Sequence, residues 1–464
     1  MGDRHRVLRR HRRAAPRGRD GDPHGAAALP RRPPSPVRRG RGAHHPGRET
    51  QDRLSHPLRD DRVARRPRRD RRRPIPAHWR GRAGGNRRPR SRPVSRWRWR
   101  GNVALLGVSL AFVLYPLLPL DDVINSDWPA FATGARLIVH DPGHLYDLDV
   151  QRRVETDVTH GRVLVSLGIR GILPFLAPAW VALVAVPFEA LGTDFGGRLW
   201  TLFGLLCLAG GLYLAIRPRA PTEILPAFAS VPAALVMLNA QIDGLVVLGI
   251  GAAIALWSRP WLAGLALGLT LMKPQLVLPL GFALLVMRAW KVLGGWAAAG
   301  LLLLAATSAL NPHWVLDWLG QSRSTVQTGA REIDLPHLAV FLPDAFQGGA
   351  LAALTAIAIA AVIALAWRRR DSFRAAAAIL VAGGIVAAPH ALPTDLVLVA
   401  LALCVWGEAR WYEWLGISVA ALVAALTPAP IPAVVGVLTI GWVCLRAAGL
   451  LTSPSPGPVP ASAR

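Results

Sequence analysis

The chain has 464 residues, 52% of them hydrophobic, and a formal net charge of +26 at pH 7. Residues 1–100 hold 33 arginines and 8 acids, a net of +25, so residues 101–464 carry only +1. A balance this basic usually indicates a nucleic-acid partner, but here it describes one tail ahead of a largely apolar chain.

Residues 1–100 are predicted to be a disordered Arg/Pro-rich tail, because such a segment cannot bury enough apolar surface to offset its ordering entropy. Binding to anionic lipid headgroups at the cytoplasmic face is one interpretation. Another is that the start codon is assigned too early. The next Met after Met1 is Met237, so translation would then begin at a codon other than Met, near Val103. The tail lacks the aromatic interleaving that stacks bases, so no nucleic-acid partner is predicted.

From Val103 onward, apolar runs recur between short polar breaks. Their lengths suit a bilayer core, which takes roughly 20 helical residues to cross, and most lack the polar face of a soluble helix. The sequence predicts an all-α fold, a polytopic transmembrane helical bundle of about 11–13 spans. This domain covers 101–447, and a disordered Pro/Ser tail is expected at 448–464. The candidate spans are 103–120, 171–191, 196–216, 224–239, 241–257, 261–287, 292–310, 347–367, 373–388, 394–407, 411–427 and 430–447.

Charge at the span ends orients the bundle. Twelve spans place the arginine tail, Arg288 with Lys291, and Arg368–Arg370 on one face, as expected for the cytoplasmic side, although Arg217 and Arg219 fall on the other. The polar stretches 121–170 and 311–346 then form outer loops. The first holds 8 acids, and within it 128–138 is expected to be an amphipathic helix lying on the membrane surface. A long acidic outer loop favours an enzyme working at the membrane surface.

Cofactor chemistry has no signature in the sequence. Cys207, Cys404 and Cys444 lie in apolar runs without CxxC spacing, so neither a disulfide nor a zinc site is predicted. The chain also has no Gly-rich phosphate loop or metal-ligand cluster, so no cofactor and no metal are expected.

Two charged residues stand out by position. Asp127 follows the first apolar run and could deprotonate an acceptor hydroxyl, or could be a solvated loop acid or a helix N-cap. Lys273, one of only two lysines, lies within an apolar run. A cation there is costly unless paired, and Pro274 breaks the helix directly after it, so Lys273 is a candidate phosphate partner. The alternative is that Lys273 snorkels to the interface.

Polar breaks in two other runs supply further candidates. Asn239 and Gln241, followed by Asp243, could bind a sugar or form a helix turn, and strict alternation of spans places them on the inner face. His390 and Asp395 lie at the outer end of two adjacent spans. The histidine could exchange a proton or bind a phosphate oxygen, or could be an interfacial residue in a tight loop.

Four segments in order carry a family resemblance: SDWPAFATGARLIVHDPGHLYD, LPFLAPAWVALVAVPFEALG, NAQIDGLVVLGIGAAIALWSRPWLAGLALGLTLMKP and APHALPTDLVLV. Together they resemble glycosyltransferase family 87, the membrane mannosyltransferases of the GT-C fold class, over most of 103–400. The sequence departs from the family pattern at Ala240, where the family usually has Gly before Gln. It departs again at Leu173-Pro174-Phe175, where an aromatic-Pro-Pro entry is usual.

The resemblance implies a hexosyltransferase that takes mannose from a polyprenyl-phosphate donor. The acceptor would be a glycolipid or polysaccharide on the outer face of the plasma membrane, among membrane lipids. Asp127 maps to the family's first-loop base, and attack opposite the phosphate would invert the anomeric centre. His390 and Lys273 map to matching positions, and from their charge we infer that they stabilise the departing phosphate.

Four more residues complete the predicted site. Arg136 is expected to bind the donor phosphate, and Gln241, Asp395 and Tyr146 are expected to bind substrate. Two other functions stay open. A multi-pass transporter or lipid flippase fits twelve spans and an intramembrane lysine, although no repeated halves are visible. A non-catalytic scaffold is the second, because nothing in 121–170 or 311–346 requires catalysis.

Overall fold

The computed structural model describes residues 111, 114–115, 123–162, 173–324 and 332–451, and every regular element among them is a helix. The predicted all-α fold is therefore confirmed. The expected tail at 1–100, nearly all of the candidate span 103–120 and most of the tail at 448–464 lie outside the described residues.

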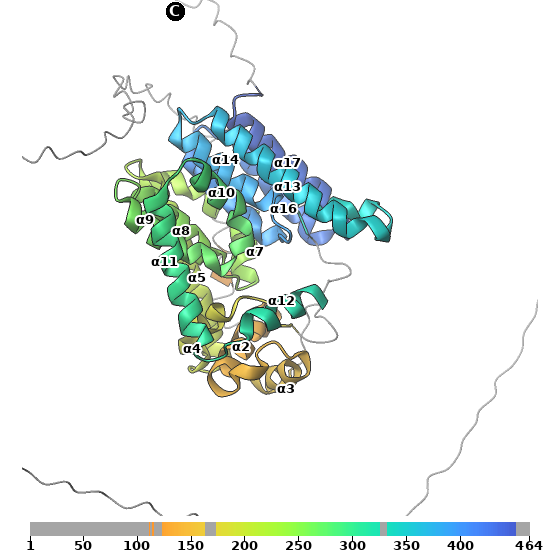
Figure 1. The fold of residues 1–464 in the computed structure, drawn as a ribbon. Helices are drawn as coiled ribbons and strands as arrows, with labels where there is room; N and C mark the ends of the chain where they lie inside the picture. Colours follow the sequence, from red (N-terminus) through yellow and green to blue (C-terminus); the bar gives the residue numbers. More distant parts are fainter. Residues whose placement is uncertain (1–110, 112–113, 116–122, 163–172, 325–331, 452–464) are drawn as a thin grey trace, which may run out of the picture. The chain divides into compact units, whose positions relative to one another are not determined.

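The helices up to residue 255 include α-helices and short 3₁₀ helices, which are marked η (Figure 1). They are η3 (Val123–Asn125), α2 (Trp128–His140), η4 (Pro142–His144), α3 (Leu148–Val158), α4 (Ala179–Glu189), α5 (Thr193–Ile216), η5 (Pro221–Ile224), α6 (Leu225–Phe228), α7 (Val231–Leu238) and α8 (Asp243–Ala255). The remainder are α9 (Pro260–Leu267), η6 (Gly268–Met272), η7 (Pro274–Val277), α10 (Leu278–Val286), α11 (Trp290–Ser308), α12 (Trp314–Ser324), η8 (Pro336–Phe341), α13 (Asp344–Arg368), α14 (Phe373–Val386), η9 (Pro393–Leu396), α15 (Val397–Trp406), α16 (Trp411–Leu426) and α17 (Ile431–Ala447).

Almost every predicted apolar run in the described chain contains a helix, but most of these helices are short. By length and composition, α5, α11 and α13 can each cross a membrane, and a fourth span results if the pair 221–228 and 231–238, bent by 70°, is counted as one. The other apolar helices have 10–17 residues. Proline, glycine and lysine interrupt the runs, as at Lys273-Pro274. The number of spans stays a prediction.

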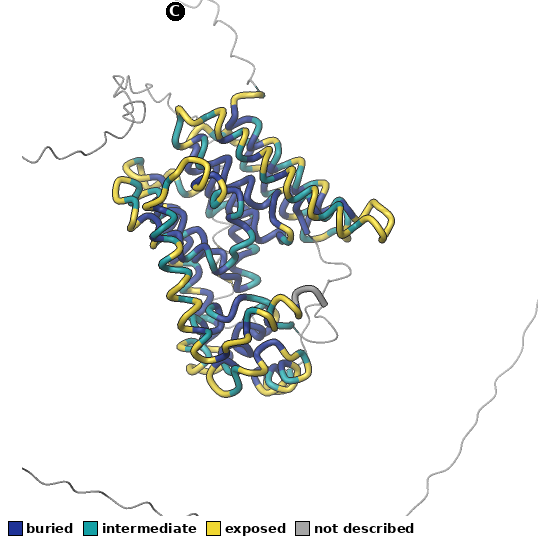
Figure 2. Tube along the Cα trace, in the orientation of Figure 1, coloured by how far each residue is buried: buried dark blue, intermediate teal, exposed yellow. Residues whose placement is uncertain are grey.

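The apolar character of the surface agrees with a membrane protein. Leu301 and Leu302 on α11 are 65% and 72% exposed, and Ile357 on α13 is 60% exposed. Figure 2 shows exposed positions recurring along both helices. A water-soluble helix would present polar side chains there, whereas a lipid-facing helix has no such need.

Helix α2 differs from its prediction. It forms where expected, but residues 128–135 are all buried, so it does not lie on a membrane surface with one face in water. It packs against α3 and α4, and the ring of Phe175 covers Gly134 so closely that an added Cβ would lie 2.6 Å from it. The Trp128 indole donates a hydrogen bond to Thr193 O at 2.8 Å. The apolar residues of α2 therefore serve packing within the protein.

Two pairs of glycines hold α5 and α8 side by side (Figure 1). A Cβ added to Gly244 would lie 2.3 Å from Gly204 O, and one added to Gly251 would lie 2.0 Å from Gly211 O. Small residues at such a repeat let two membrane helices approach backbone to backbone. This contact fixes the start of α8, where several polar residues of the site lie.

Candidate active site

Asp127 directly precedes α2, but its carboxylate does not cap that helix. Instead, Gln241 Nε2 donates a hydrogen bond to Asp127 Oδ2, and Asp127 N donates to Asn239 O at 3.1 Å. Asp127 therefore occupies the N-cap position of α2, but its side chain makes no capping hydrogen bond. The segment predicted to be the first outer loop is joined at Asp127 to the turn between α7 and α8.

The contact also corrects the predicted topology, which placed the Asn239–Gln241 break on the opposite face from Asp127. That prediction assumed one straight span before the break. The chain instead forms the two short helices that end at Phe228 and Leu238, bent by 70°, so strict alternation of faces does not apply.

The turn that carries Gln241 has an unusual backbone at Ala240, whose φ is +48°. This left-handed conformation costs a residue with a Cβ roughly 1 kcal/mol, and glycine adopts it freely. The Trp200 indole supports the turn by donating a hydrogen bond to Ala240 O at 2.8 Å. Glycine, which the family that the sequence resembles usually has at this position, would adopt this conformation without strain.

Lys273 lies in the break between η6 and η7 and bridges two carboxylates. Its Nζ is 2.9 Å from Asp243 Oδ2 and 2.7 Å from Asp395 Oδ1. The side chains of Lys273, Asp243 and Asp395 are 12%, 0% and 2% exposed. Lys273 therefore does not snorkel to an interface. A buried lysine paired with two carboxylates is the expected arrangement, because burying an unpaired charge would cost too much free energy.

The charge balance of this triad constrains what it can bind. One ammonium and two carboxylates sum to −1 when all are ionised, and two of the three ammonium N–H donors are already used. The triad alone is not an electropositive site. Its lysine does act on Asp127: burial raises the pKa of Asp127 to about 6, while the Lys273 charge and the Gln241 hydrogen bond lower it.

A second polar cluster joins the loop before η8 to the loop after α14. Glu332 Oε1 lies 3.2 Å from His390 Nδ1 and 3.4 Å from His337 Nε2, so one carboxylate oxygen contacts both rings. His337 Nδ1 lies 2.8 Å from Asp334 Oδ1. Burial lowers the pKa of His337, but the hydrogen bond and charge of Asp334, with Glu332, raise it above its usual value.

Two consecutive backbone amides connect the clusters. Ala391 N donates to Asp334 Oδ2 at 2.9 Å, and Leu392 N donates to Asp395 Oδ2 at 2.6 Å. Asp395 thus holds Lys273 with one oxygen and the 389–393 loop with the other. His390, whose side chain is 45% exposed, is placed by the loop that the Lys273 triad anchors.

The structure does not bring the other two predicted residues to these clusters. Arg136 lies nine residues after Asp127 in α2, about 13 Å along the helix axis, and its Nη2 pairs with Glu189 Oε1 at 2.6 Å. Tyr146 is buried, stacks on Phe175, and donates its hydroxyl to Ala177 O at 2.9 Å. These contacts serve the packing of α2, α3 and α4.

Several residues of the clusters escaped the sequence analysis. Asp243 was noted only as a neighbour of Gln241, and Glu332, Asp334 and His337 were not singled out. A signal existed, because REIDLPH places two acids and a histidine close together in a segment between apolar runs. What the sequence could not reveal is that this segment lies against 386–391, where Ile333 N and Leu335 N donate to Ala391 O and Val386 O.

One comparison with known proteins gave a match. Residues 175–393 match the family model of glycosyltransferase family 87. The match contains Gln241, Lys273 and His390, whereas Asp127 and Asp395 lie outside it. No curated protein and no solved structure matched the chain.

Proposed function

We propose that this chain, whose residues 175–393 match the family model of glycosyltransferase family 87, moves mannose from a polyprenyl-phosphate donor to a lipid-linked or polysaccharide acceptor on the outer face of the plasma membrane, with inversion. Glycosyl transfer and a membrane location follow from the family and the apolar helices. The sugar, the donor, the acceptor and the face rest on the sequence resemblance and the charge distribution.

The observation that carries the proposal is the position of Asp127. Its carboxylate is half-buried, with a pKa raised to about 6. Among the described residues, Gln241 donates a hydrogen bond to Asp127 Oδ2, and Oδ1 is proposed to accept from the acceptor hydroxyl. A carboxylate of this pKa is mostly ionised at neutral pH and still basic enough to accept a proton.

The proposed reaction needs one base and a stabilised leaving group. As the acceptor oxygen bonds to the anomeric carbon, its proton passes to Asp127. The bond between the anomeric carbon and the phosphate oxygen breaks on the opposite side, and polyprenyl phosphate leaves with the electron pair. A positioned base contributes about 10²–10⁴-fold to such a step.

The remaining predicted residues fall into two groups. The third N–H of Lys273 and the partly exposed ring of His390 are proposed to meet the phosphate. Gln241 and Asp395 are proposed to position Asp127 and Lys273, in addition to any contact with substrate. The ligand contacts predicted for Arg136 and Tyr146 stay predictions, because both side chains already have partners in the packing of α2.

The test compares Asp127→Asn with a matched variant, Asp149→Asn, whose carboxylate is 82% exposed on α3. Membranes expressing each full chain receive radiolabelled polyprenyl-phosphate mannose and a lipid extract from the source cells. We expect Asp127→Asn to lose at least about 100-fold in transfer to new glycolipid, with unchanged expression and insertion, and Asp149→Asn to keep it.

Two results would count against this function. An unchanged rate in Asp127→Asn would exclude Asp127 as the base. Labelled lipid that crosses reconstituted vesicles without forming a new product would favour the flippase alternative.

A further inference from the structure

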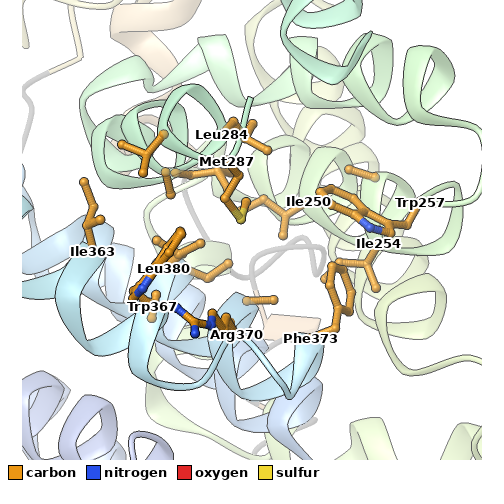
Figure 3. A pocket seen from close by; sticks show the side chains of 18 of the residues that line it. Ile250, Ile254, Trp257, Leu284, Met287, Ile363, Trp367, Arg370, Phe373 and Leu380 are labelled. Atoms are coloured by element: carbon orange, nitrogen blue, oxygen red, sulfur yellow. The ribbon is translucent and has the colours of Figure 1, made fainter. Parts of the chain in front are cut away.

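A cavity of about 80 Å³ lies among α8, α10, α13 and α14, away from the polar clusters. It is several times larger than the space one water needs, and its walls are apolar, so it would stay dry. Figure 3 shows Ile254, Trp257, Leu284, Met287 and Trp367 around it. Arg370 is the single charged residue among those that line it.

The cavity and the candidate active site lie toward opposite ends of α8. Asp243 begins that helix, while Ile250 and Trp257, which line the cavity, follow seven and fourteen residues later. At the rise of an α-helix Ile250 is about 10 Å from Asp243 along the axis, and Trp257 lies beyond the end of the helix at Ala255. A ligand with its phosphate at Arg370 would therefore occupy a site distinct from the one around Asp127.

Positive charge gathers where these helices end. The segments 256–261, 286–292 and 367–375 contain seven arginines and lysines and one acid, Asp371. The guanidinium carbon of Arg370 lies 5.0 Å from the Trp367 ring centroid, and Arg370 is exposed. Arginine offers paired N–H donors that match phosphate oxygens, and basic pockets between membrane helices bind anionic headgroups.

We propose that this cavity binds a segment of one acyl chain of an anionic glycerophospholipid whose phosphate is held by Arg370. The apolar walls contact the acyl chain, and the guanidinium of Arg370 donates hydrogen bonds to the phosphate. The donor's polyprenyl chain is the other candidate occupant, but its phosphate must reach the Asp127 end of α8, which leaves Arg370 without an anion. The lipid site does not depend on the proposed transferase function.

The experiment uses the full chain in detergent, titrated with phosphatidylglycerol carrying a brominated acyl chain. Bromine quenches nearby indoles, and Trp257 and Trp367 line the cavity. The chain has 17 tryptophans. The quenching that belongs to the cavity is therefore the part of the total quenching that disappears in Trp257→Phe. Residues 1–100 are the same in every variant, so any lipid that they attract cancels in comparisons between variants.

We expect saturable quenching by phosphatidylglycerol and weaker quenching by phosphatidylcholine with the same chain. Arg370→Gln should bind about tenfold more weakly, which is about 1.4 kcal/mol. Arg374→Gln removes the same charge from an exposed residue outside the lining and should bind as the unmodified chain does. Ala377→Phe, which fills the cavity, should abolish the quenching at Trp257.

Three results would overturn the proposal: equal affinity in Arg370→Gln and the unmodified chain, equal binding of the two headgroups, or displacement of phosphatidylglycerol by polyprenyl phosphate. If Ala377→Phe fails to fold, the two exposed arginine variants decide the question by themselves. None of these readouts measures sugar transfer, so failure here leaves the test of Asp127 untouched.

Discussion

Replacing Gln241 with Met should change the pH dependence of transfer more than its maximal rate. Gln241 donates to one oxygen of Asp127, and this bond is among the effects that lower the pKa of that carboxylate, which burial raises to about 6. Methionine has a similar length and no N–H donor, so it removes the bond with little change in packing. The ionised form of Asp127 then loses a stabilising partner, and its pKa rises.

The expected size follows from the energy of one hydrogen bond to a charged group. A loss of about 1.5 kcal/mol raises the pKa by about one unit, to about 7. A general base works only when ionised, so activity increases with pH through this pKa. At pH 6 the ionised fraction would fall from about one half to about one tenth, but at pH 8 only from about 99% to about 91%. The variant should therefore lose about fivefold in rate at pH 6 and little at pH 8.

The assay is the initial rate of mannose transfer, measured from pH 5 to 8.5 at saturating donor. Thr201→Val is the control, because it removes a buried hydrogen bond, from Thr201 Oγ1 to Gly197 O, on the neighbouring α5. Its profile should keep the midpoint near 6. An unshifted midpoint in Gln241→Met would refute the role of this bond in setting the ionisation of Asp127. An equal loss at every pH would mean that Gln241 acts on substrate binding instead.

Two backbone positions give further predictions. Ala240→Gly should raise the free energy of unfolding by up to about 1 kcal/mol, because Ala240 has a φ of +48°; a lower midpoint of thermal unfolding would contradict this. Gly384→Ala should destabilise the protein by about 1–3 kcal/mol and slow transfer, because its Cβ would lie 1.9 Å from Leu276 O in η7, next to Lys273. Gly441→Ala on α17 meets nothing within 4 Å and should be neutral or slightly stabilising; similar effects of the two substitutions would disprove the packing argument.

The helices were the predictable part of this fold, because apolar runs of sufficient length specify helices wherever the surrounding solvent is lipid. The break at Lys273-Pro274 was also visible, since a proline after a lone lysine leaves little choice but an interrupted helix. The bend between Phe228 and Val231 was not visible. Hydropathy is the same for a straight span and for two short helices, and the error placed Gln241 on the wrong face.

Pairing of charges was the other limit. A lysine in an apolar run requires a partner, but its spacing in sequence does not say which acid supplies it. Lys273 contacts Asp243, 30 residues away, and Asp395, 122 residues away. The packing of α8 against α5 and η6 and of α14 against η7 helps to bring these residues together, and those contacts depend on glycines whose role no local pattern reveals.

The division of charge between the two clusters bears on how a phosphate could be accommodated. Around Asp127 and the Lys273 triad the ionised groups sum to −2, which suits proton abstraction and gives the singly charged phosphate of the donor few favourable partners besides the third N–H of Lys273. The second cluster holds two imidazoles, and the pKa of His337 is raised by its neighbours. Its two carboxylates are less exposed than the rings, with Glu332 8% and Asp334 0% exposed. The arrangement therefore favours an acceptor hydroxyl at Asp127 and the phosphate of the donor beside His390.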